Sequence, residues 1–226
     1  MKKQGMTIDE KLNSVRAGVL GSNDGILTVV GVLFSVSAAS GSHFALLIAC
    51  LANLISGAFS MASGEYASVS AQSDSEKVVV AQEKRLLKKN FNKEKEVVKD
   101  FYIEKGISPE TSSKIANELL ELMPLENVLA VKYDITLGHY MNPWQAAWSS
   151  LFSFTIGGLF PFATLLLVKG IWQFPATILA TVLAMALTGM ISAKLSDGLL
   201  IKAIIRNIII GLITIFFHYF IGRIFG

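Results

Sequence analysis

The sequence predicts an all-α membrane protein that has five transmembrane helices and a helical cytoplasmic insert between the second and third spans. Hydrophobic residues occupy 52% of the 226 positions and the mean hydropathy is +0.53, which is too apolar for an ordinary soluble domain. The apolar residues fall into five runs, each near the ~20 residues that a helix needs to cross a bilayer core. The expected spans cover residues 14–39, 44–66, 146–168, 172–193 and 201–225. The chain therefore divides into an N-terminal segment with a transmembrane hairpin (1–66), an insert (67–142) and three further spans (143–226).

The basic residues predict the orientation in the membrane. Eighteen of the 20 Lys and Arg residues precede the first span, lie in the insert or flank the junction of the last two spans. Basic residues are retained on the cytoplasmic side, so we expect the N-terminus and the insert in the cytoplasm and the C-terminus outside. The first eighteen residues are polar and lead straight into the first span, which predicts no cleaved signal peptide.

Asp24 is the first candidate functional residue because it interrupts the apolar run of the first span. An ionised side chain at membrane depth costs at least about 2.5–3.5 kcal/mol, so such residues usually face the interior of a helix bundle. There they mark paths for ions or protons. Asp24 is therefore expected to line such a path.

The second span supplies two further candidates, Met61 and Glu65. A short polar turn joins the first two spans, so they run antiparallel, and at ~1.5 Å per residue Asp24 and Met61 lie roughly 23 and 26 Å from the turn. Gly57, Met61 and Glu65 are spaced by four and share one helical face. A thioether favours a transition metal over Mg²⁺ or Ca²⁺, although methionine is also common packing material.

The insert, residues 67–142, contains eleven basic and twelve acidic residues. Its caps and breaks predict four helices: a capping-box pattern at Ser73 opens the first, Gly106 ends the second and Pro124 separates the third from the fourth. The expected ranges are 73–90, 92–105, 109–123 and 125–133. Its carboxylates could bind a divalent cation, but their spacing alone favours a solvated charged surface.

The sequence lacks the residue patterns that are typical of several other classes of protein. The single cysteine, Cys50, excludes an intrachain disulfide and a cysteine-based metal cage. There is no phosphate-binding loop, no hydrolase constellation and no purely basic surface for nucleic acid, so we expect no enzyme and no permanently bound cofactor. Movement of a substrate would then depend on an ion gradient or on the gradient of the substrate itself.

Four segments resemble the vacuolar iron transporter family. They are GVLGSNDGI in the first span, ISGAFSMASGEYASVSAQSDSE leaving the second, NPWQAAWSSLFSFTIGGLFPF in the third and HYFIGRIFG at the end. The resemblance implies a five-span homodimer that exchanges Fe²⁺, and often Mn²⁺, for protons. It also implies a path at the dimer interface lined by Asp24 and Met61. In a prokaryotic plasma membrane, this orientation would export metal from the cytosol.

The resemblance extends to the insert only in part. By position, Glu83 and Glu94 match two metal-binding glutamates of the family, and Asp134 matches a later acidic ligand. Four other expected ligand positions hold residues without ligating side chains: Leu86, Val97, Ala130 and Val131. We therefore expect the insert to fold but to bind metal weakly.

Together these observations predict a divalent transition-metal transporter, for Fe²⁺ or Mn²⁺, that works as a proton antiporter. Asp24 would take metal and proton alternately, Met61 would favour softer ions, and Glu65 would receive metal near the cytosolic mouth. The expected partners are divalent metal ions, lipid and a second copy of the chain, without nucleic acid. Two alternatives stay open from the sequence: a passive cation channel, and a non-transporting scaffold whose insert binds a protein partner.

Overall fold

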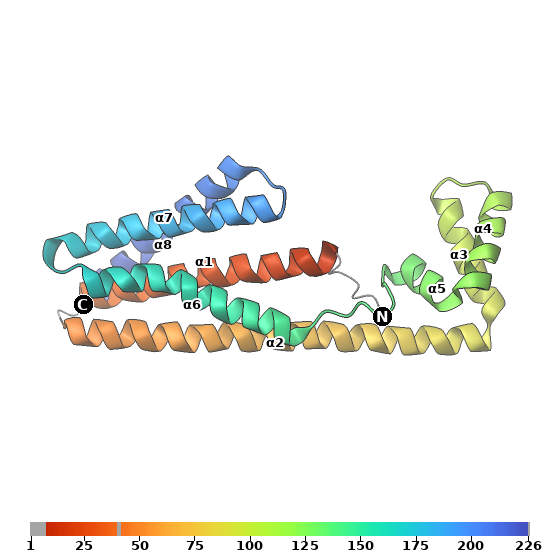
Figure 1. Cartoon of the computed structure of the whole chain (residues 1–226), viewed down its shortest axis with the longest axis horizontal. Helices are drawn as coiled ribbons and strands as arrows, with labels where there is room; N and C mark the ends of the chain where they lie inside the picture. The colour runs from red at the N-terminus through yellow and green to blue at the C-terminus, as the bar shows by residue number, and fades with distance from the viewer. Residues whose placement is uncertain (1–7, 40–41, 226) are drawn as a thin grey trace, which may run out of the picture. The chain divides into compact units, whose positions relative to one another are not determined.

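The computed structural model describes residues 8–39 and 42–225, which form helices and connecting loops without any strand (Figure 1). The predicted all-α class is confirmed for this part of the chain. The elements are α1 (Ile8–Ala39), α2 (His43–Lys89), α3 (Phe91–Glu104), α4 (Pro109–Leu122), α5 (Pro124–Tyr133), α6 (Pro143–Leu167), the 3₁₀ helix η1 (Gly170–Trp172), α7 (Gln173–Leu195) and α8 (Leu200–Phe225).

Five helices of the described chain are long and apolar enough to cross a membrane, as the sequence predicted. They belong to α1, α2, α6, α7 and α8. The chain separates into two compact units, a membrane unit of residues 1–68 with 142–226 and an insert unit of residues 69–141. Helix α2 contributes its first part to the membrane unit and its last part to the insert unit.

Helix α1 is central to the membrane unit because it contacts α6, α7 and α8. Its apolar residues meet those of α2, α6 and α8 in one core. The buried members of that core are Val29, Val30, Leu33, Phe34, Leu46, Cys50, Leu54, Ala58, Phe154, Phe162, Leu165 and Ile215. Cys50 is a free thiol that is completely buried among them.

Helices α1 and α6 approach each other through glycine. A Cβ atom added to Gly25 would lie 2.1 Å from the carbonyl oxygen of Phe154, and one added to Gly157 would lie 2.3 Å from the carbonyl oxygen of Ser22. Both neighbours are backbone atoms, which cannot move aside as a flexible side chain can. Small residues of this kind allow transmembrane helices to pack backbone against backbone.

The prediction of a separate helix beginning at Ser73 was wrong, because α2 continues unbroken through this residue. No glycine or proline occurs between Tyr66 and Lys89 to end the helix. Ser75 Oγ donates to the carbonyl of Ala71, four residues earlier, at 2.9 Å, and Ser73 is itself buried within the helix. The serine and acidic residues that resemble a capping box therefore lie inside a continuous helix.

The remaining helices of the insert follow the predicted order with shifted caps. Helix α3 begins after Asn90 rather than Asn92, and the Asn90 side chain makes no capping hydrogen bond. Ser108 caps α4 as predicted, since its Oγ accepts from the Thr111 amide at 3.3 Å, and Pro109 is the first helical residue. Their buried apolar contacts come from Val98, Ala116, Leu120 and Val128.

Substituting Gly25 by alanine should destabilise the membrane unit. Overpacking a tight contact costs typically ~1–3 kcal/mol, and the clash at Gly25 is with backbone. Gly18→Ala is the matched control on the same helix, because its added Cβ would lie 3.4 Å from the Ser153 hydroxyl. We expect a lower unfolding midpoint in detergent for Gly25→Ala and an unchanged or slightly higher one for Gly18→Ala. Equal midpoints would contradict the close packing of α1 on α6.

Candidate metal path and the charged cluster of the insert

Asp24 lies half-buried within α1. Thr28 Oγ1 donates to the backbone carbonyl of Asp24, one turn earlier. The neighbouring residue Asn23 reaches α8, where its Oδ1 accepts from Asn207 Nδ2 at 3.5 Å. Asn207 is 3% exposed, so this pair is a polar contact within the membrane unit.

Sequence reasoning did not single out Asn23 or Asn207. Asn23 belongs to the GVLGSNDGI segment of the first span, and Asn207 directly follows Arg206 in the fifth span. An amide at that position was the available signal, because polar residues within a span usually contact one another. The structure shows that Asn23 on α1 contacts Asn207 on α8, which the spacing of residues along one helix could not reveal.

Met61 and Glu65 lie on the predicted face of α2. Gly57, one turn before Met61, lies against Phe154 of α6, so that an added Cβ would be 2.2 Å from the ring. Met61 is partly buried against the main apolar core, and Glu65 is 8% exposed. This face of α2 therefore runs from Gly57, which packs against α6, to the buried carboxylate of Glu65.

Arg16 of α1 is the charged neighbour of Glu65. The closest approach is 3.9 Å between Arg16 Nη2 and Glu65 Oε2, and Glu65 Oε2 has no hydrogen-bond partner. The Arg16 side chain is 60% exposed and its Nε donates to Asn13 Oδ1 at 3.1 Å. This is a long ion pair with one partner in solvent, a type that usually contributes little to stability.

The Arg16–Glu65 pair supports the predicted depths of Asp24 and Met61. Helices α1 and α2 run antiparallel (Figure 1), so both residues lie on the same side of this pair. Asp24 is eight residues beyond Arg16, about 12 Å, and Met61 is four residues before Glu65, about 6 Å. Asp24 and Met61 therefore differ in depth by only about 6 Å.

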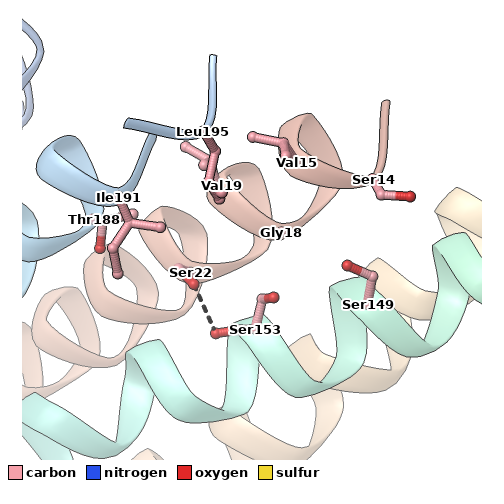
Figure 2. Close-up of a pocket in the computed structure, with 10 residues that line it drawn as sticks. All are labelled: Ser14, Val15, Gly18, Val19, Ser22, Ser149, Ser153, Thr188, Ile191 and Leu195. Carbon is pink, nitrogen blue, oxygen red and sulfur yellow. Dashed lines mark hydrogen bonds between the residues drawn. The ribbon is translucent and has the colours of Figure 1, made fainter. Parts of the chain in front are cut away.

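A hydroxyl-lined pocket of about 380 Å³ opens between α1, α6 and α7 (Figure 2). Ser22 Oγ donates to the carbonyl of Ser153 at 3.2 Å, and no charged side chain of the described residues lines the pocket. Asp24 is two residues beyond Ser22, which turns it about 200° around α1 and away from the pocket. The pocket and the carboxylate thus occupy different faces of the same helix.

The buried threonines of α7 satisfy their hydroxyls within their own helix. Thr177, Thr181 and Thr188 each donate to the carbonyl four residues earlier, at 2.8, 2.8 and 2.9 Å. These hydroxyls therefore need no ligand or water to complete a hydrogen bond.

In the insert unit, Glu83 of α2 and Glu94 of α3 lie together around Lys132 of α5. Lys132 Nζ donates to Glu83 Oε1 at 2.8 Å and to Glu94 Oε2 at 3.0 Å. Tyr133 Oη donates to the same Glu83 oxygen at 2.8 Å. The exposed fractions of Glu83 and Glu94 are 0% and 3%, so both carboxylates are removed from water.

The two carboxylates shift the pKa values of their partners. Burial alone would lower the pKa of Lys132, but the hydrogen bonds and charges of Glu83 and Glu94 raise it above its ordinary value. The hydrogen bond to Glu83, followed by burial, raises the pKa of Tyr133. Lys132 therefore stays a cation at neutral pH.

Asp134, the third predicted ligand of the insert, does not join this cluster. It is exposed and ends α5 in the left-handed conformation, with φ of 55°. Val131 packs into the apolar core of the insert, and Ala130 is exposed. Within the described residues, no group of three or more His, Cys, Asp or Glu side chains has the spacing of a metal site. The metal-binding roles of the six predicted residues remain predictions.

These features define an all-helical membrane protein with a carboxylate inside its first span and a charged helical insert after its second. The chain belongs to the VIT family, whose sequence profile matches residues 15–223. The predicted resemblance to this family is therefore confirmed.

Individual relatives match different lengths of the chain. A "vacuolar iron transporter" of Acanthamoeba castellanii is 35% identical over 158 residues, which cover 70% of this chain and 56% of that protein. "Vacuolar iron transporter homolog 1" of Oryza sativa subsp. japonica is 50% identical over 60 residues, 26% of each chain. "VIT-like transporter 1b" of Glycine max is 26% identical over 213 residues, 94% of this chain and 76% of that one. The match thus spans about half of the first relative and a quarter of the second.

Proposed function

We propose that this chain is a divalent transition-metal transporter that moves Fe²⁺ or Mn²⁺ out of the cytosol in exchange for protons. The observation that carries the proposal is Asp24, a half-buried carboxylate within α1 at nearly the depth of Met61. A carboxylate at membrane depth must be neutralised, and a proton or a metal cation can do this. Because the two compete for one group, binding of one releases the other, which is the basis of antiport.

Met61 and Glu65 extend this site along α2. The Met61 sulfur supplies a soft ligand and so favours a softer transition metal such as Fe²⁺ over Mg²⁺. Glu65 is buried, but its counter-ion Arg16 is distant and largely exposed. An incoming metal ion can therefore replace the guanidinium, which moves into water. Glu65 would in this way receive metal at the cytosolic mouth.

The exposed surface of α2 supports a homodimer with the path at its interface. Ser56, Ser60 and Gly64 are exposed, and a Cβ added to Gly64 would meet nothing within 4 Å. This small-residue strip lies beside the face of Met61 and Glu65. Strips of this kind allow a second transmembrane helix to approach closely. A second copy would then cover the open side of the path.

The direction of transport follows from the proposed orientation. The basic N-terminal segment and insert support a cytosolic position for the Glu65 end of the path. The names of the relatives support iron as a substrate, and two of the three relatives described above are called vacuolar. We assign this chain to the plasma membrane, where metal leaving the cytosol is exported.

Asp24→Asn should abolish metal flux while the protein still folds. The amide keeps the size of the carboxyl group, but it has no negative charge to neutralise a metal ion and it does not bind and release a proton near neutral pH. The measurement is Fe²⁺ or Mn²⁺ uptake into liposomes together with internal pH. Asp197→Asn is the matched control, since Asp197 is exposed with φ of 50°, a conformation that asparagine tolerates. Full flux in Asp24→Asn would contradict the carrier role.

The same assay separates the rival functions. Metal flux coupled to an opposite movement of protons supports the antiporter. Flux without a pH change would identify a passive channel, and no flux in the parent chain would favour a scaffold.

Met61→Leu should reduce Fe²⁺ flux several-fold without unfolding the protein. Leucine keeps the volume and apolarity but removes the sulfur, and such exchanges usually cost less than ~1.5 kcal/mol. Met185→Leu is the control, because Met185 is completely buried in a different apolar cluster with Ile26 and Ala184. If both variants transport alike, Met61 is packing material only.

Cysteine labelling in intact cells tests the orientation. Lys169 and Glu118 are both exposed, and Cys50 is fully buried and should give little background. We expect an impermeant thiol reagent to label Lys169→Cys in intact cells and Glu118→Cys only after lysis. The reverse pattern would overturn the direction of transport.

A further inference from the structure

We propose that Lys132 is the built-in counter-ion of Glu83 and Glu94, and that its ammonium group occupies the place a divalent cation would take between them. The three residues come from α5, α2 and α3 respectively. Lys132 Nζ contacts one oxygen of each glutamate, at 2.8 and 3.0 Å. One tethered cation therefore links three helices of the insert.

Burial makes a counter-ion necessary at this position. Glu83 is completely buried and Glu94 is 3% exposed. Two ionised carboxylates removed from water destabilise a fold unless an opposite charge with good hydrogen-bond geometry lies between them. Lys132 is the cation in contact with both carboxylates within the described residues, and Tyr133 adds a neutral donor to Glu83.

The cluster is also built into the apolar core of the insert. Each charged residue lies one helical turn from an apolar residue of that core, namely Leu87, Val98 and Val128. The side chains of a helix at positions i and i+4 lie on the same face. The packing that orders the core therefore also holds the charges together.

An open ligand position remains within the cluster. Glu83 Oε2 is buried and has no hydrogen-bond partner, while Glu83 Oε1 accepts from both Lys132 and Tyr133. Divalent ions such as Mn²⁺ bind several convergent carboxylate oxygens, and Glu83 and Glu94 provide these once the ammonium group is removed. With Lys132 present, charge repulsion keeps the metal out. This gives a second reason, besides the missing ligands, for weak metal binding by the insert.

The test is hydrogen exchange of the full chain in detergent, read by mass spectrometry in peptides from Phe91–Glu104 and Pro124–Tyr133. In the parent chain, protection should be the same with chelator and with millimolar Mn²⁺. In Lys132→Leu, which has no charge or ligating atom, exchange should be at least about tenfold faster with chelator, because removing one partner strands buried charges. Millimolar Mn²⁺ should restore the protection.

Two further variants serve as controls. Lys132→Arg keeps the charge and should stay protected without metal. Tyr133→Phe removes one neutral donor and should not make the insert depend on Mn²⁺. Metal-dependent protection of the parent chain would overturn the proposal, and so would a Lys132→Leu insert that is protected without metal or is not restored by Mn²⁺. These readouts are local to the insert, so they are independent of transport through the membrane unit.

Discussion

The backbone contact between α1 and α6 is the constraint on which the membrane unit depends. Gly25 and Gly157 bring the two helices closer than any side chain would permit, and Gly25 directly follows Asp24. The closeness of the helices therefore fixes the height and rotation of the carboxylate. Apolar side chains from four helices fill the space on the turn side of this contact. The position of the proposed ligand is thus a result of packing, since an unsupported charged side chain would move toward water.

Two groups of polar side chains in the membrane unit differ in how their polarity is satisfied. The threonine hydroxyls of α7 are satisfied by their own helix and can be carried through a bilayer at little cost. Asp24 and Glu65 are different, because no intrahelical bond neutralises a charge. Asn23, the residue before Asp24, accepts a hydrogen bond from Asn207 and so links α1 to α8. Charge inside the bundle is therefore concentrated at a few side chains, while most of its surface and core are apolar.

Features set by local sequence were predicted well, and features set by contacts between helices were not. The five spans follow from hydropathy alone, and the Ser108 cap follows from one serine before Pro109. The false helix start at Ser73 arose because a capping box is recognisable only where a helix actually begins. Glu83 and Glu94 were identified by family resemblance, yet their partner Lys132 is 49 and 38 residues away. No spacing rule along one helix could have brought these residues together.

The burial of Cys50 has a consequence for chemical durability. The only thiol of the chain is fully covered by the apolar core of the membrane unit, so oxidants dissolved in water do not reach it in the folded state. Ferrous iron and peroxide together generate radicals that attack exposed sulfur. A protein proposed to handle such a metal thus keeps its most vulnerable sulfur in the driest part of the molecule. Met61, the sulfur proposed to bind metal, is only partly buried, and its oxidation would convert a soft ligand into a polar sulfoxide.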